Sequence, residues 1–155
     1  MNKPIHPLIA SDGGNVAYED DAYGWAIEQA AHLRAGHIDR LDLINLAEEI
    51  EDVAKSERRA AESALRILMM HVLKWQMQSD RRTRSWSLSI LAQRIAYDRQ
   101  LEDNPSLAPL ADDMRAKAFK RSRIEAAQEM DVPLRSIPLE PPSWPTILDE
   151  PFEVD

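Results

Sequence analysis

The feature that most constrains the fold of this chain is a long stretch without helix breakers. Residues 42–78 contain neither glycine nor proline, and apolar residues recur in them at the spacing of a helix face. The chain has only 4 glycines, and six of its 10 prolines follow residue 130. A body without these residues and rich in Ala, Leu, Glu and Arg is typical of helices. The sequence therefore predicts an all-α fold.

The length of 155 residues, with 44% apolar residues, is enough for one domain with a hydrophobic core. Residues 1–15 carry two prolines and a glycine pair, so we expect a loose N-terminal arm there. Residues 16–155 are expected to form a single helical domain. We predict a bundle of about five helices, with the proline-rich segment 131–155 wrapping over it.

Four long helices are expected, near residues 21–35, 42–78, 85–103 and 106–130, and a short turn near Pro145–Leu148. Polar side chains suited to capping precede them: Asp20 or Asp21, then Asp42, Ser85 and Ser106. Gly36 supplies the left-handed stop of the first helix. The polar stretch 55–59 leaves open whether the second helix is continuous or broken into two.

Each helix carries an apolar stripe that predicts a buried face. In the first helix the stripe is Tyr23, Ala26, Ile27, Ala30 and Leu33, and in the third it is Leu88, Leu91, Ala92 and Ile95. The second helix carries Leu43, Leu46, Ala47, Ile50, Val53 and Ala54, then Ala61, Ala64, Leu65, Leu68, Val72 and Trp75. In the fourth helix the candidates are Leu110, Met114, Ala118 and Phe119. Ile67, Met69 and Leu73 widen the apolar surface of the second helix, which predicts a central, mostly enclosed segment.

Composition disfavours several classes of function. A net charge of −8 argues against general nucleic-acid binding, which requires a basic surface. The absence of cysteine excludes disulfides, thiolate metal sites and cysteine nucleophiles, and it suits a reducing cytoplasm.

We find no signal peptide and no run of transmembrane length, so we expect a cytoplasmic protein without a membrane partner. No glycine-rich phosphate loop, Ser-His-Asp order or zinc spacing is present, and no cofactor is predicted.

Several motifs resemble those of a bacterial family known as domain of unknown function family twenty-nine. They are YEDDAYGW at residues 18–25, LRAGHIDRLDLINLAEEIEDVAKSERRA at 33–60, LMMHVLKWQ at 68–76 and RSWSLSI at 84–90. NPSL at 104–107 and the Pro/Trp-rich ending add to the likeness, although members tend to have a Pro-Trp pair where this chain has PPSWP. The resemblance covers nearly the whole chain. It implies a bacterial, all-helical protein and assigns no activity.

An acidic cluster is the first candidate for chemistry. Glu48 and Asp52 stand four residues apart on one helix face, with Glu49 beside them. Carboxylates at this spacing can hold a hard cation such as Mg²⁺. No Glu-x-x-His pair of the di-iron type accompanies them, and no metal site is assigned. We favour a solvated face balanced by arginines of a neighbouring helix.

His71 is the second candidate. It stands inside an apolar run with no carboxylate three or four residues away. A histidine in such surroundings can act as a general base. Stacking on Trp75, or a hydrogen bond from the core, accounts for it without a role in binding, and we favour this structural interpretation because no catalytic partner is identifiable.

Arg81, Arg82 and Arg84, followed by Trp86, form the third candidate. Guanidinium groups bind phosphate oxygens in pairs and indole stacks on bases, so the cluster could contact nucleic acid. The structural alternative is that Trp86 covers the edge of the core and the arginines pair with the carboxylates of residues 48–52. We favour this structural role.

The function most consistent with these observations is a non-catalytic helical interaction module that binds another protein or forms a homodimer through residues 65–75. The alternative is a metal-assisted enzyme that acts on phosphodiesters or nucleotides. It would place Glu48, Glu49 and His71 near the metal, with Arg81 or Arg84 on phosphate. A third possibility is nucleic-acid binding through residues 81–86.

Overall fold

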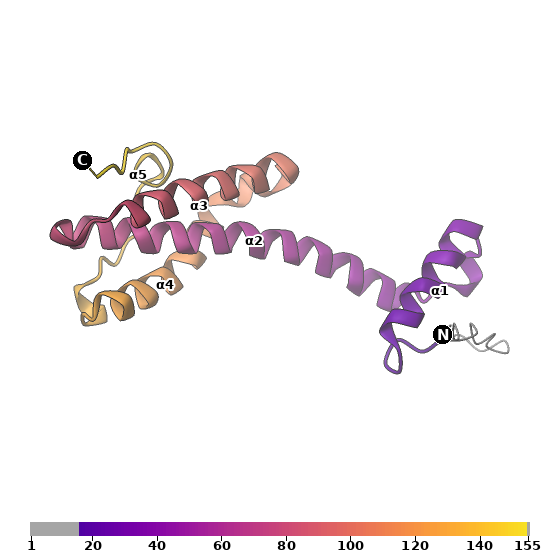
Figure 1. The fold of residues 1–155 in the computed structure, drawn as a ribbon. Coiled ribbons are helices and arrows are strands. Elements are labelled where there is room, and N and C mark those ends of the chain that lie inside the picture. The colour runs from indigo at the N-terminus through magenta and orange to yellow at the C-terminus, as the bar shows by residue number, and fades with distance from the viewer. Residues whose placement is uncertain (1–15, 155) are drawn as a thin grey trace, which may run out of the picture. The chain divides into compact units, whose positions relative to one another are not determined.

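The computed structural model describes residues 16–154, and the expected N-terminal arm lies outside them. The described residues form five α-helices and no strand, which confirms the predicted all-α fold (Figure 1). The helices are α1 (Ala22–Ala35), α2 (Leu43–Met77), α3 (Arg84–Asp103), α4 (Ala111–Met130) and α5 (Trp144–Leu148). Short 3₁₀ turns at Ile38–Arg40, Ser79–Arg81, Pro105–Leu110 and Leu134–Ser136 lie between them.

Local capping signals set the ends of these helices. Asp21 caps α1 by accepting a hydrogen bond from the Gly24 amide at 2.9 Å, and Gly36 ends it with φ of 74°. The prediction that Ser85 caps the next helix is wrong. Thr83 does so, because its Oγ1 accepts from the Trp86 amide at 3.3 Å and α3 starts one residue earlier.

The start of α4 also differs from the prediction. Ser106 does not cap an α-helix, because residues 105–110 form a 3₁₀ turn and α4 begins at Ala111. Pro105 and Pro109 both lack the amide hydrogen that an α-helix would use. The α-helix begins two residues after Pro109.

The second predicted helix is continuous. α2 runs for 35 residues, and the polar stretch 55–59 does not interrupt it. This stretch holds no glycine or proline, and an i,i+4 ion pair spans its end, with Arg58 Nε 2.9 Å from Glu62 Oε1. Such pairs stabilise a helix whose residues lack apolar contacts.

The chain divides into two compact units, which the sequence analysis did not anticipate. Unit 1 comprises residues 1–52, and unit 2 comprises residues 53–155. Unit 1 therefore contains α1 and the first residues of α2, whereas unit 2 contains the remainder of α2 with α3, α4 and α5. The two units are described separately below.

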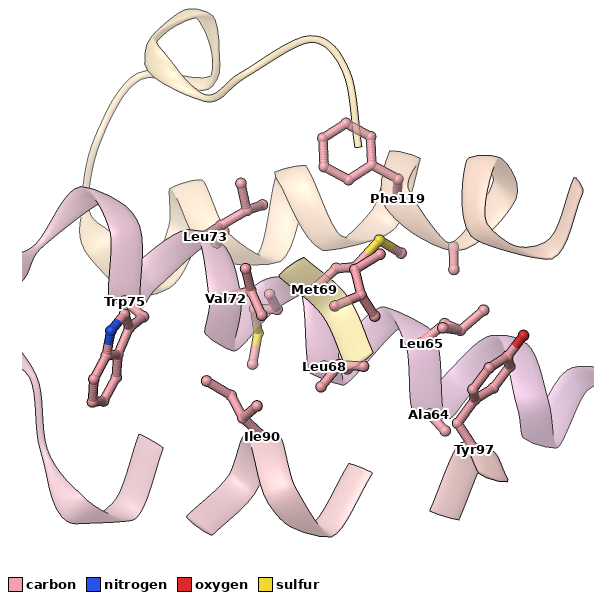
Figure 2. Packing of buried hydrophobic residues seen from close by; sticks show 14 of the residues in the cluster. Ala64, Leu65, Leu68, Met69, Val72, Leu73, Trp75, Ile90, Tyr97 and Phe119 are labelled. Atoms are coloured by element: carbon pink, nitrogen blue, oxygen red, sulfur yellow. The ribbon is translucent and has the colours of Figure 1, made fainter. Parts of the chain in front are cut away.

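Unit 2 is built around the second part of α2, which α3 and α4 flank (Figure 1). The predicted enclosure of this helix is confirmed, since its buried side chains point in several directions. They are Ala61, Ala64, Leu65, Leu68, Met69, Met70, Val72, Leu73, Lys74 and Trp75. Figure 2 shows side chains of α2 directed both toward Ile90 of α3 and toward Phe119 of α4. Met114, Ala118 and Phe119 are buried as predicted, whereas Leu110 is 38% exposed.

The segment after α4 closes the same core. Ile137, Ile147 and Phe152 are buried in it. The guanidinium of Arg94 donates from Nε to the carbonyl of Ile147 at 2.7 Å and from Nη2 to that of Thr146 at 3.2 Å. The Ser87 hydroxyl donates to the Phe152 carbonyl. These bonds hold the proline-rich chain against α3. They satisfy backbone carbonyls of a segment that forms no long helix.

The predicted buried stripe of α3 is wrong. Leu88, Leu91 and Ile95 are 57%, 53% and 61% exposed, and Ala92 is exposed with them. The core side of α3 is instead the face with Ile90 and Tyr97. The two faces carry similar apolar content, and the long-range packing against α2 and the C-terminal segment decides between them.

Candidate functional site

In unit 1, polar contacts around Asp42 join α1 to the start of α2. Its carboxylate accepts hydrogen bonds from Trp25 Nε1 at 3.2 Å and from the amide and side chain of Asn45 at 3.2 and 2.6 Å. These bonds lower the pKa of the Asp42 carboxyl, the Asn45 contributions being the largest. The Asp42 amide in turn donates to Gln29 Oε1 at 2.8 Å. Asp42 therefore caps α2, as the sequence predicts, and also anchors the indole of Trp25.

A second contact involves the residues before α1. The ring of Tyr18 meets Trp25 edge-on, with centroids 4.9 Å apart, and its hydroxyl donates to Glu49 of α2. The hydrogen bond and the negative charge of Glu49 raise the pKa of Tyr18 above its ordinary value. Glu49, which the alternative enzyme hypothesis places near a metal, thus accepts a hydrogen bond from a phenol.

Almost nothing else in unit 1 is buried. Among residues 16–52, Trp25 and Gln29 alone fall in the buried class. The predicted core face of α1 is exposed instead, with Tyr23, Ile27 and Leu33 at 79%, 58% and 50%. On α2, Leu43 and Ile50 are 63% and 69% exposed. The predicted burial of these two faces is wrong, because no further α-helix among residues 16–52 covers them.

We refer to Tyr23, Ile27 and Leu33 of α1 and Leu43 and Ile50 of α2 as the unit 1 apolar residues. They stand in acidic surroundings. Unit 1 contains 11 Asp and Glu residues against 3 Lys and Arg, a net charge of −8, whereas unit 2 contains 16 of each. The entire net charge of the protein therefore lies in unit 1.

The predicted acidic site does not form a metal centre in the described residues. No group of three or more His, Asp or Glu side chains placed to hold a metal ion is found among residues 16–154. Glu48 and Glu49 are both exposed on α2, and Glu49 accepts the hydrogen bond from Tyr18. Glu51 and Asp52 also have interaction partners. The cluster is a solvated helix face that contributes negative charge.

His71 lies on α2 in unit 2, half-buried, and its Nδ1 has no hydrogen-bond partner in the described part of the chain. Burial lowers the pKa of His71 and the positive charge of Lys74 lowers it further, while Glu129 acts in the opposite sense. The Trp75 ring meets Phe152 edge-on at 5.6 Å, and the ring pairs found within residues 16–154 do not include His71 with Trp75. His71 therefore lies at the edge of the core with a lowered pKa, and no hydrogen bond orients its Nδ1 within residues 16–154.

The arginine cluster separates into different roles. Arg82 has a structural role, because it donates from Nε to the Trp75 carbonyl at 3.0 Å and stacks over the Trp75 ring. Arg81 and Arg84 are exposed and form no ion pair with the described residues of unit 2. The expected pairing with carboxylates 48–52 would join the two units and stays a prediction. Trp86 packs against the core, with Lys74 Nζ 4.5 Å from its ring centroid.

The predicted site residues do not come together within either unit. Glu48 and Glu49 belong to unit 1, whereas His71, Arg81, Arg84 and Trp86 belong to unit 2. Within unit 2, His71 makes no hydrogen bond or ion pair with the arginines among the described contacts. The arrangement that a metal-assisted phosphodiesterase would need is therefore not present in one unit.

The described structure defines the class of this protein as an all-helical protein with two compact units. None of the helices in residues 16–154 has both the length and the apolar character needed to cross a membrane. Comparison with family models identifies the chain as a member of the family described as Domain of unknown function DUF29, matched over residues 17–153. The match confirms the family that the motifs indicate. No curated protein and no solved structure matches the chain.

Proposed function

We propose that this protein is a non-catalytic helical interaction module, in which unit 1 binds a basic amphipathic helix of another protein. The observation that carries the proposal is the exposure of the unit 1 apolar residues, five large side chains at least half exposed. A contiguous apolar patch on a folded unit is a common mark of a protein-binding site, and we propose that these side chains form one. We place the protein in the bacterial cytoplasm, on the family likeness and the absence of cysteine.

The spacing of these residues favours a helical partner. Tyr23, Ile27 and Leu33 follow a helical stripe on α1, and Leu43 and Ile50 stand one heptad apart on α2. Stripes at this spacing accept the apolar side of a partner helix by knobs-into-holes packing. Burial of each such side chain contributes about 1.5 to 3 kcal/mol when the partner covers it fully.

Charge determines which partner fits. Two copies of unit 1 that met through these residues would bring together two units of net charge −8, and like charges in contact oppose association. A helix with Lys and Arg beside its apolar side chains would meet the opposite charge. The previously expected dimer through residues 65–75 has a separate obstacle, because Leu65, Leu68 and Val72 are each 0% exposed inside unit 2.

The proposal is tested with synthetic helices of defined charge. A labelled amphipathic Leu/Lys peptide, its Leu/Glu counterpart and a scrambled Leu/Lys peptide are titrated with the full chain in a fluorescence anisotropy assay. We expect binding of the amphipathic Leu/Lys peptide alone, with affinity that falls as salt rises. Equal binding of the scrambled peptide would show simple charge attraction and contradict a docking face.

A matched pair of variants locates the site. L43S combined with I50S removes two unit 1 apolar residues, and L134S combined with I124S removes a Leu and an Ile that are 44% and 56% exposed in unit 2. The first variant should bind the Leu/Lys peptide at least about tenfold more weakly, because two buried anchors are lost. The second should bind like the unmodified protein. A sedimentation experiment that shows a dimer disrupted by the first variant alone would replace the basic partner by a second copy.

A further inference from the structure

A pocket lies between α2 and α4 in unit 2, away from every residue discussed as a site so far. Its volume is about 350 Å³, which is within the range of small-molecule sites. The polar side chains that line it are Arg59, Glu62, Ser63, Arg66, Lys117 and Arg121. Four of the six are cationic, and none is aromatic.

The one carboxylate in this lining is already neutralised. Glu62 Oε1 lies 2.9 Å from Arg58 Nε, and its Oε2 lies 2.9 Å from Lys117 Nζ. The side chain of Glu62 is only 11% exposed, so it is held at the base of the pocket by cations on both sides. It orients Lys117 from α4 against α2.

The remaining cations exceed the carboxylates available to them. Arg66 pairs with Glu125, and Arg121 approaches the other oxygen of the same carboxylate at 3.9 Å. Arg59 takes part in no ion pair within the described residues. Arg121 is 76% exposed. Two guanidinium groups, one from each helix, therefore keep hydrogen-bonding capacity at the mouth of the pocket.

The frame of the pocket is rigid. Ser122 is fully buried, and its Oγ lies 2.8 Å from the Arg66 carbonyl and 3.0 Å from the Ala118 carbonyl. Ala118 and Ala126 are buried on the same side of α4, and small side chains let two helices approach closely. The cations stand on two helices that are fixed against each other, and such preorganisation lowers the entropic cost of binding.

We propose that this pocket binds a small phosphate-bearing anion with two or more negative charges, of the diphosphate or triphosphate kind. Guanidinium groups match phosphate oxygens with paired, charge-assisted hydrogen bonds. The absence of an aromatic side chain from the lining means that a nucleobase attached to the phosphates would find nothing to stack on. This site shares no residue with the unit 1 apolar residues, and the two proposals are independent.

Isothermal titration of the full chain with pyrophosphate and with tripolyphosphate tests the proposal. The variant R59Q/R121Q removes one charge from each helix at the pocket mouth. The control R99Q/R135Q removes two exposed arginines of unit 2 outside the pocket. We expect R59Q/R121Q to bind at least about tenfold more weakly, since each charge-assisted hydrogen bond contributes a factor of this size. The control should bind like the unmodified protein, and circular dichroism should show equal helix content in all three.

Four results would overturn the proposal. The first three are no heat with either anion at millimolar concentration, an equal loss in both variants, and ATP binding at least about tenfold tighter than tripolyphosphate, a difference of about 1.4 kcal/mol that contacts to the nucleoside would supply. A single-stranded oligoribonucleotide provides the last comparison. If it bound through Arg59 and Arg121 at least about tenfold tighter than tripolyphosphate, the groove would be a nucleic-acid site instead. The proposal would be supported if ATP and tripolyphosphate bound with similar affinity and the oligoribonucleotide bound no more tightly than either.

Discussion

Unit 1 and unit 2 contain similar amphipathic helices, but unit 2 buries their apolar side chains and unit 1 leaves them exposed. In unit 2, α2 is surrounded, and Leu65, Leu68, Met69 and Val72 are each 0% exposed. In unit 1 the same helix presents Leu43 and Ile50 to solvent at 63% and 69%. Unit 2 balances its charges, and unit 1 carries the whole net charge of −8. An apolar stripe therefore predicts what a helix can bury, and the number of neighbouring elements determines whether it does so.

The difference also shows in how each unit is stabilised. Unit 2 relies on apolar burial, whose contribution grows with the area removed from water. Unit 1 relies on directed polar contacts around Asp42, each of which adds little because water competes for the same groups. We expect the two units to respond differently to the same kind of substitution.

The sharpest test compares two leucines on one helix. Leu68→Ala removes a side chain that is 0% exposed, and Leu43→Ala removes one that is 63% exposed. We expect Leu68→Ala to lower the free energy of unfolding by about 2 to 5 kcal/mol through lost burial and a residual cavity. Leu43→Ala should change it by less than about 0.5 kcal/mol. Urea denaturation followed by circular dichroism measures both changes. Equal losses of unfolding free energy would contradict the contrast between the two units.

A second prediction concerns the polar anchor of unit 1. Trp25→Phe keeps an aromatic ring but removes the indole N–H that donates to Asp42 at 3.2 Å. Amide hydrogens of residues 22–35 should then exchange about tenfold faster, because local opening becomes easier. Exchange of the α3 and α4 amides in unit 2 should stay unchanged. Hydrogen exchange read by mass spectrometry tests this, and faster exchange throughout both units would show that they open as one.

The smallest expected effect concerns pH and unit 2. Burial lowers the pKa of His71 in the folded protein, so the unfolded chain binds the proton more readily. Stability is therefore complete above the ordinary histidine pKa and decreases as the pH falls through it toward the lowered value. The melting temperature should drop between about pH 7.5 and about pH 5.5, and less so in His71→Gln. An identical drop in the variant would assign the effect to other groups.

Sequence reasoning recovered the helices and the central core. The stretch without glycine or proline predicts α2, and the wide apolar surface of residues 61–75 predicts its enclosure, because both depend on local composition. The division into two units was missed. It depends on which helices have neighbours, and Ile27 of α1 carries the same local signal as a core residue such as Leu68.

The site was harder to predict than the fold. Glu48, Glu49, His71 and Arg84 were chosen for their chemistry, and the structure places them in different units without a common partner. The pocket cations were missed because Arg59 and Arg121 stand 62 positions apart in the sequence. The signal that could have found them is the recurrence of Arg and Lys every three or four residues on both helices, which alone also fits a solvated face.

The closure of the core by residues after α4 bears on how the protein is made. Ile137, Ile147 and Phe152 seal the core against α3, and they leave the ribosome after all four long helices. Until then the nascent chain exposes the side of Ile90 and Trp75 that these residues will cover. Until residues 137–152 have been made, the nascent chain therefore exposes more apolar surface, and it depends on this later segment, or on a chaperone, to avoid aggregation.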